Sequence, residues 1–216
     1  MKRAFLLTLV VLGLLAAPLA GPAVAKDPAK KSPADAKGGV LGEWQTEDGL
    51  VYRYRLPKKF DAEKGANLVL ILHGSNLDRR WGFANHSYKT FRPDDIVVSP
   101  DGTTSNGRGG FNLLDGPNDL KRFKALLEEL KGMLKVKKTY LYGHSQGSFF
   151  SIHYASQHPD DIDGIVAHAS GIWIPFRGGK KGHHQAIVMM HGTQDPVVPY
   201  GNSTGGFELL KERKYP

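Results

Sequence analysis

The fold is decided by one stretch, Lys138-Thr-Tyr-Leu-Tyr-Gly-His-Ser145-Gln-Gly-Ser-Phe-Phe-Ser-Ile-His-Tyr-Ala155, in which the hydrophobic period changes at a serine. Residues 140–142 are typical of a strand inside a sheet, and the apolar residues that follow the serine are typical of a helix packed on it. Gly143 and Gly147 flank Ser145 where a larger side chain would collide as strand and helix approach. This Gly-x-Ser-x-Gly spacing predicts a nucleophile elbow, a strained turn that exposes the serine hydroxyl.

Strands and helices alternate along the chain around this stretch. Two short runs joined at Asp48-Gly49 predict an antiparallel hairpin at the edge of a sheet. The later apolar runs predict parallel strands linked by helices, so the fold class is α/β, with a mostly parallel central sheet and helices on both faces. Asn118 or Asp119 is predicted to cap the first long helix. The expected strands lie at 42–46, 50–56, 67–72, 95–99, 140–142, 162–168 and 185–190, and the helices at 117–134, from 146 onward and at about 205–214.

The N-terminus has the pattern of an export signal. Lys2 and Arg3 precede an apolar run over 4–17, and Ala23-Val24-Ala25 has the small-x-small form of a signal-peptidase site. The run is shorter than the roughly 20 residues that span a bilayer, which favours a cleaved signal peptide over 1–25. The sequence contains no cysteine, which excludes disulfides, cysteine metal sites and lipoprotein-type acylation. We expect a secreted or periplasmic protein without a stable membrane anchor.

The composition predicts one folded domain behind a linker. A chain of 216 residues that is 40% hydrophobic supports one domain with a core. Residues 26–41 are mostly Lys, Asp, Pro, Ala, Ser and Gly without apolar periodicity, and they predict a disordered basic linker before a domain over 42–216. The net charge is +8, but no stripe of basic residues interleaved with aromatics indicates a nucleic-acid partner. An acidic wall polymer or an anionic lipid surface is the alternative polyanionic partner.

Three motifs, all in the same order as in the family, give the chain a resemblance to the α/β-hydrolases. They are His73-Gly74 after an early strand, Gly143-His-Ser145-Gln-Gly147, and His191-Gly-Thr-x-Asp195-x-x-Val-Pro199 after a late strand. The region from about 42 to 214 most resembles secreted carboxylesterases of the phospholipase/carboxylesterase, feruloyl-esterase and polyhydroxybutyrate-depolymerase-like groups. The elbow motif is shared with thioesterases and some peptidases, so it does not identify the subgroup.

The resemblance implies a role for each matched residue. Ser145 is expected to attack a carboxylic ester and form an acyl-enzyme, and Asp195 to orient the histidine base. The oxyanion donors are expected at the main-chain N–H of Gln146 and in the loop at Ser75 or Asn76. No metal or organic cofactor is implied, and the substrate is an ester of a small molecule, a polysaccharide or a polyester. The alternatives are an exported peptidase or thioesterase of the same fold and a non-catalytic binding protein that retains it.

The histidine of the triad is the role that no residue fills. The family order is serine, acid, histidine, and no histidine follows Asp195. We therefore expect a C-terminally incomplete domain, with a last strand and a histidine loop encoded beyond Pro216, and slow ester turnover by this chain. The alternatives are a natural pseudoenzyme or a base recruited from His168 or His86.

The remaining histidines have structural explanations. His73 and His191 belong to strand-end motifs in which the imidazole supports the following loop, and His144 is a common variant beside the serine. The pair at 183–184 has no third metal ligand at a useful spacing. The sequence therefore predicts no metal site.

Overall fold

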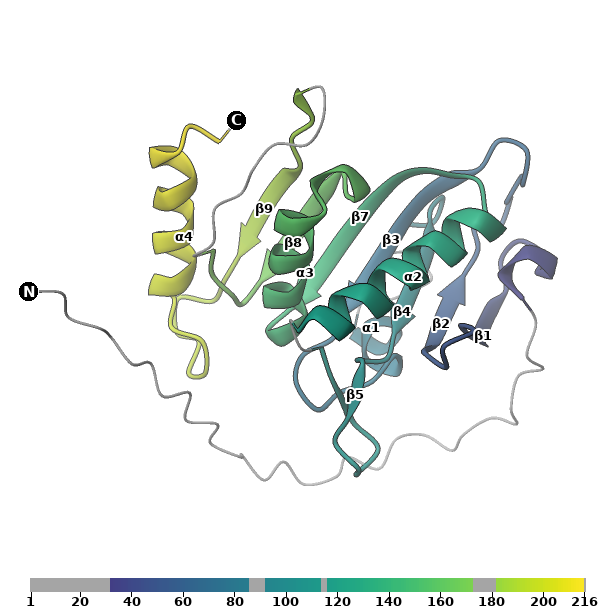
Figure 1. Cartoon of the computed structure of the whole chain (residues 1–216), viewed down its shortest axis with the longest axis horizontal. Helices are drawn as coiled ribbons and strands as arrows, with labels where there is room; N and C mark the ends of the chain where they lie inside the picture. Colours follow the sequence, from purple (N-terminus) through teal and green to yellow (C-terminus); the bar gives the residue numbers. More distant parts are fainter. Residues whose placement is uncertain (1–31, 86–91, 114–115, 173–181, 216) are drawn as a thin grey trace, which may run out of the picture.

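A central sheet organises the part of the chain that the computed structural model describes, namely residues 32–85, 92–113, 116–172 and 182–215 (Figure 1). The sheet strands are β1 (Leu41–Gln45), β2 (Val51–Arg55), β3 (Ala66–Leu72), β4 (Ile96–Pro100), β7 (Val136–His144), β8 (Gly164–His168) and β9 (Ala186–Met190). A separate hairpin consists of β5 (Thr104–Ser105) and β6 (Phe111–Asn112). The helices are α1 (Arg80–Asn85), α2 (Pro117–Met133), α3 (Gln146–Gln157) and α4 (Gly201–Glu212), and η1 (Pro33–Asp35) and η2 (Pro159–Asp161) are single 3-10 turns.

The strand order places the functional loops at one edge. The described sheet runs β1-β2-β4-β3-β7-β8-β9, with β1 and β2 antiparallel and the five strands from β4 to β9 mutually parallel. After β3 the chain adds β4 on one side of it and then crosses back to add β7 on its other side. The direction in which successive strands are added therefore reverses at β3, near the middle of the sheet. The carboxyl ends of parallel strands meet at one edge, which is where open α/β sheets carry their sites.

Alternate residues of each strand fill two different cores. Leu68, Leu70 and Leu141 face the large core, which α2 and α3 cover with Phe123, Phe150 and other buried residues. Ile71 and Val97 face the opposite side and form a small second cluster with Phe83 of α1. Figure 1 shows α2 and α3 in front of the sheet and α1 behind it. Helices therefore lie on both faces, as the alternation of elements predicts.

Two helix starts differ from the prediction. The cap of α2 is Gly116, not Asn118 or Asp119, because Pro117 occupies the first turn, where its fixed φ and missing N–H fit. Helix α4 begins at Gly201 rather than near residue 205. Gly206 does not interrupt this helix but allows close contact, since a Cβ there would lie 2.6 Å from the main-chain nitrogen of Ile172.

The predicted linker overlaps the described fold. Pro33 is buried in η1, and the Ser32 hydroxyl donates to Sδ of Met133 across 3.4 Å. The chain is thus packed against α2 from residue 32, whereas residues 26–31 and the predicted signal peptide over 1–25 lie outside the described residues. None of the helices in the described ranges is both long and apolar enough to cross a bilayer.

Candidate active site

Ser145 stands at the junction of β7 and α3 in a strained conformation. It caps α3 with φ of 50° and ψ of −119°. A residue other than glycine at positive φ costs about 1–3 kcal/mol, and such strain persists only where surrounding contacts impose it. The predicted strand, turn and helix are therefore present, and the turn has the strain expected of an elbow.

The two flanking glycines allow strand and helix to approach each other. A Cβ on Gly143 would lie 2.4 Å from Cα of Ser148, and a Cβ on Gly147 would lie 2.4 Å from the carbonyl oxygen of Leu72. Both distances are to main-chain atoms, which cannot rotate away. Any larger residue at either position would push β7, α3 and β3 apart.

The main chain of Ser145 is held on both sides. Its N–H donates to the carbonyl of His168 across 2.9 Å, and its carbonyl accepts from the N–H groups of Ser148 and Phe149. The hydroxyl has no hydrogen-bond partner among the residues that the structure describes. The loop after β3 runs alongside, since a Cβ on Gly74 would lie 3.5 Å from Cβ of Ser145.

The predicted oxyanion donors differ in availability. The N–H groups of Gln146 and Ser75 have no acceptor within the described chain. The N–H of Asn76 donates to Oδ1 of Asn112 across 3.2 Å, and Asn76 has φ of 62°. The geometry therefore leaves Gln146 and Ser75 free to donate to an oxyanion, whereas Asn76 is already bonded.

Side-chain amides tie the hairpin β5–β6 to this edge of the sheet. Oε1 of Gln146 accepts from the N–H of Leu113 across 2.9 Å, and Nδ2 of Asn106 donates to Oδ1 of Asn76 across 3.0 Å. The N–H of Phe111 donates to the carbonyl of Leu77 across 2.8 Å. The hairpin thus forms a polar wall beside both candidate oxyanion donors.

Asp195 lies in the loop after β9 at the same edge. Its Oδ1 accepts from the N–H groups of Val197 and Val198 across 2.8 and 2.9 Å. These bonds, that of Val198 foremost, lower the pKa of the carboxyl below its usual value, and attraction to His191 and His144 lowers it further. The N–H groups of the loop therefore favour the ionised form of the carboxyl.

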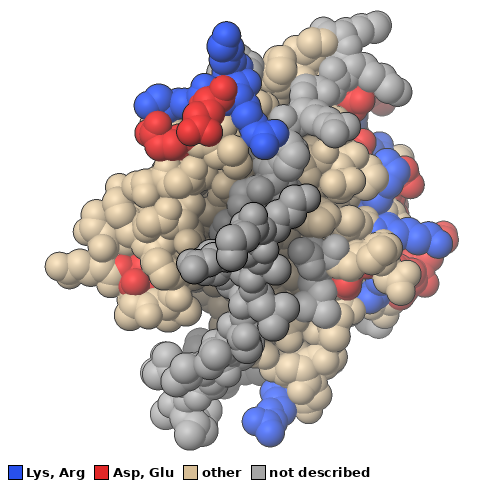
Figure 2. All heavy atoms as spheres, turned by 60° about the vertical axis from the view of Figure 1, so that its left-hand side comes forward, with Lys and Arg blue, Asp and Glu red and all other residues tan. Residues whose placement is uncertain are grey.

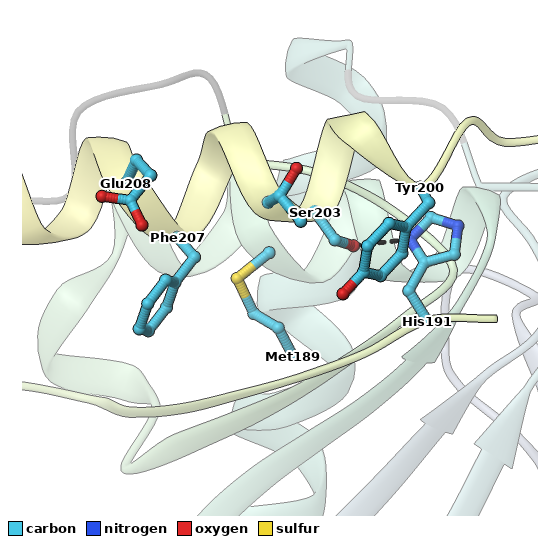
Figure 3. Close-up of a pocket in the computed structure, with 7 residues that line it drawn as sticks. Met189, His191, Tyr200, Ser203, Phe207 and Glu208 are labelled. Carbon is cyan, nitrogen blue, oxygen red and sulfur yellow. Dashed lines mark hydrogen bonds between the residues drawn. The ribbon is translucent and has the colours of Figure 1, made fainter. Parts of the chain in front are cut away.

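His191 is buried beneath this loop and contacts two of its residues. Its side chain is 1% exposed, and Nδ1 lies 2.5 Å from Oγ of Ser203 while Nε2 lies 2.9 Å from the carbonyl oxygen of Val198. Nε2 is also 3.5 Å from Oδ2 of Asp195. Figure 3 shows the imidazole between the end of β9 and the first turn of α4, at one end of a pocket of about 300 Å³. The pocket is lined by Met189, His191, Tyr200, Ser203, Thr204, Phe207 and Glu208.

The other histidines near the strand ends are also bonded. His73 is fully buried and its Nδ1 lies 2.7 Å from the carbonyl oxygen of Gly74, and burial lowers the pKa of the ring. Nδ1 of His168 lies 3.1 Å from Nδ1 of His144. His86, the other predicted alternative base, is outside the described residues. In the described ranges, no group of three His, Cys, Asp or Glu side chains is arranged to hold a metal ion.

A chain of buried hydroxyls joins α3 to the loop of Asp195, and sequence reasoning did not identify it. Oγ of Ser148 lies 2.6 Å from Oγ of Ser170, and Oγ of Ser203 donates to the carbonyl of Ser170 across 2.5 Å. His191 completes the path. Serines this far apart in the sequence form no motif that would predict the link. The one available signal was the position of Ser148 in the first turn of the helix after the elbow, which predicts that it faces the protein interior.

Comparisons with known proteins agree with this arrangement. A family model described as the alpha/beta hydrolase fold matches residues 67–182. The bifunctional acetylxylan esterase/xylanase XynS20E of Neocallimastix patriciarum is 26% identical over 178 residues, which cover 81% of this chain and 26% of that protein. A 1-acylglycerol-3-phosphate O-acyltransferase of Arabidopsis thaliana is 25% identical over 114 residues, covering 53% of this chain and 27% of the relative. The chain thus spans about a quarter of the length of these relatives.

Solved structures share the fold at low sequence identity. The CE1 ferulic acid esterase AmCE1/Fae1A of Anaeromyces mucronatus has a TM-score of 0.59 at 18% identity, over 89% of this chain and 85% of that one. Esterase PE8 has a TM-score of 0.58 at 20% identity, over 83% of this chain and 86% of the other. The predicted fold, a mostly parallel sheet of the α/β-hydrolase type, is confirmed.

Proposed function

The chain belongs to the α/β-hydrolase family, and we propose that it is an exported serine esterase that cleaves carboxylic esters through an acyl-enzyme on Ser145. One observation supports this most strongly. Ser145 has φ of 50° between two glycines that admit no side chain, and its hydroxyl is unbonded within the described chain. A strained serine that serves only as a helix cap would use its hydroxyl to cap the helix, and this one does not.

The proposed reaction has named candidates for the nucleophile, the oxyanion donors and the triad acid, whereas the base is not assigned to a residue. A base removes the hydroxyl proton of Ser145 as Oγ attacks the acyl carbon, and the negative charge that develops on the carbonyl oxygen is stabilised by the N–H groups of Gln146 and Ser75. The intermediate then expels the alcohol, which takes the proton from the base. Water attacks the acyl-enzyme in the same way and releases the acid. Asp195 orients the base and stabilises its protonated form.

The names of similar proteins support a choice of ester class. These names include an acetylxylan esterase and a ferulic acid esterase, which support an ester carried on a polysaccharide. The 1-acylglycerol-3-phosphate O-acyltransferase makes a lipid ester the second candidate. The polar wall formed by the hairpin β5–β6 suits a hydroxylated substrate, because amide side chains donate and accept hydrogen bonds. Comparing release of acetate and ferulate from xylan with hydrolysis of polyhydroxybutyrate tests this choice.

Export is part of the proposal and rests on the N-terminal pattern. Cleavage after Ala25 would leave a mature chain that begins at Lys26. N-terminal sequencing of the protein exported by a bacterial host tests this, and recovery of Met1 in the membrane fraction would contradict it.

The decisive experiment removes the nucleophile. Ser145→Ala should abolish labelling by a fluorophosphonate and lower hydrolysis of p-nitrophenyl acetate and butyrate by far more than about tenfold, or roughly 1.4 kcal/mol of transition-state stabilisation. Ser156→Ala, on the same helix, is the matched control and should react like the parent. Labelling independent of Ser145 would refute the assignment. Faster cleavage of peptide p-nitroanilides would indicate a peptidase, and no labelling of the parent would indicate a binding protein.

A further inference from the structure

Two imidazoles meet at the ends of β7 and β8. His144 and His168 are paired in the parallel register of these strands, and their Nδ1 atoms lie 3.1 Å apart. At this distance one nitrogen carries a hydrogen and the other accepts it, so at least one of the two rings is neutral. Trp81 stacks on His144 with ring centroids 4.8 Å apart and planes 13° apart, and Oη of Tyr142 lies 3.3 Å from Nδ1 of His168. The imidazole pair is therefore fixed from both sides.

His168 also contacts Ser145 directly, through its main chain. The carbonyl of His168 accepts from the N–H of Ser145 across 2.9 Å. Ser145 and Ala169, the residues that follow the two histidines, both have positive φ, 50° and 54°. Both β7 and β8 thus end in strained backbone immediately after the imidazole pair. Contacts of this kind are what hold a strained residue in place.

We propose that His168 is a positioning residue: its side chain, through His144, holds Ser145 in the conformation that presents the hydroxyl. This inference rests on the proposed function, in which Ser145 is the nucleophile. Helix α3 fixes the serine from its carboxyl side by the bonds of Ser148 and Phe149 to its carbonyl. On the amino side, Ser145 is held by its hydrogen bond to the His168 carbonyl and by the position of the preceding residue, His144. The contact between the two imidazoles fixes the position of His144.

Two substitutions of one residue test the inference. His168→Phe keeps a ring but loses the hydrogen bond, and His168→Asn places an amide group near the position of Nδ1. We expect the Ser145 amide to exchange with D2O about tenfold faster in the Phe variant, and fluorophosphonate labelling to slow by a similar factor, the scale of one hydrogen bond. In the Asn variant, the exchange rate of the Ser145 amide and the rate of fluorophosphonate labelling should both lie within about threefold of the parent values.

The controls separate this role from others. His184→Phe removes an imidazole at the opposite end of β9, where the ring contacts Tyr215, and should change neither readout. Asparagine cannot act as a base, so loss of labelling in both variants, with Ser145 exchange unchanged, would make His168 the base and overturn the positioning role. Exchange of the Ser145 amide equal to the parent in His168→Phe would overturn it as well. Amide exchange does not require turnover, so the inference is tested even if Ser145→Ala shows that the proposed function is wrong.

Discussion

The elbow (residues 143–147) and the acid loop (residues 191–199) each follow a parallel strand, but they are held by different kinds of contact. β7 pairs with β3 on one side and β8 on the other, so the elbow lies within the sheet. β9 is an edge strand of the described sheet, with Val188 and Met190 exposed by 52% and 47%. In Figure 2, which brings the α4 side of the molecule forward, uncharged side chains predominate among the described residues, and most of the charged ones lie toward the edges of the view.

The contacts of the elbow come from distant parts of the sequence, and those of the acid loop are mostly local. Ser145 is bonded to His168, and Gly147 packs on Leu72. Asp195, in contrast, bonds to the N–H groups of the residues two and three positions later, and its own N–H donates to the carbonyl of Gly192 across 3.2 Å. The position of the serine is thus imposed by the fold, whereas the position of the carboxylate is imposed largely by its own loop.

The largest expected difference between the two regions comes from adding one methyl group to each. Gly147→Ala should lower the free energy of unfolding by about 3 kcal/mol, because the new Cβ would meet the main chain of Leu72 at 2.4 Å. Gly192→Ala should change it by less than about 0.5 kcal/mol, since the nearest atom to that Cβ is the nitrogen of Asp195 at 4.0 Å. Urea unfolding followed by circular dichroism measures both. If the two substitutions lowered the free energy of unfolding equally, the elbow would not be more tightly constrained by the surrounding fold than the acid loop.

The same distinction explains how much could be predicted from the sequence. The elbow was predictable because its requirements fall within five consecutive residues around Ser145, and the position of Asp195 was recognisable from a motif after a strand. The parallel character of the sheet, although not its strand order, follows from alternating strands and helices. These features depend on short-range patterns, which a single sequence contains.

Contacts between residues far apart in the chain were not predictable. Asn76 was an oxyanion candidate equal to Ser75 until the structure showed its N–H bonded to Asn112, a residue 36 positions away. The link from Ser148 through Ser170 to Ser203 joins three segments that no periodicity connects. Gly116 caps α2 in place of the predicted Asn118 or Asp119, because Pro117 occupies the first position of the helix.

An intermediate effect is expected where the acid loop depends on another element. Ser203→Ala should lower the free energy of unfolding by about 2 kcal/mol, because Nδ1 of His191 and the carbonyl of Ser170 would both lose a buried partner. Thr204→Ala is the control on the same helix turn, where the hydroxyl bonds to an exposed carbonyl, and should cost less than about 0.5 kcal/mol. Urea unfolding of the two variants measures the difference. If they are equally stable, the buried hydroxyl chain does not support the loop.

The smallest effect is expected for the charge of Asp195 itself. Its pKa is lowered in the folded protein, so the bonds of the carboxylate to Val197 and Val198 stabilise the loop fully above the ordinary aspartate pKa of about 3.9 and are weakened as the pH falls through the lower folded value. Asp195→Asn retains an oxygen acceptor, and at pH 7 it should cost less than about 0.5 kcal/mol because the group is near solvent. The amide proton shifts of the two valines, followed by NMR from pH 7 down to strong acid, should titrate below the ordinary aspartate range in the parent and stay constant in the variant. A titration midpoint above that range would mean that burial, not hydrogen bonding, dominates the carboxyl, and the acid loop would then resemble the elbow in being shaped by the fold around it.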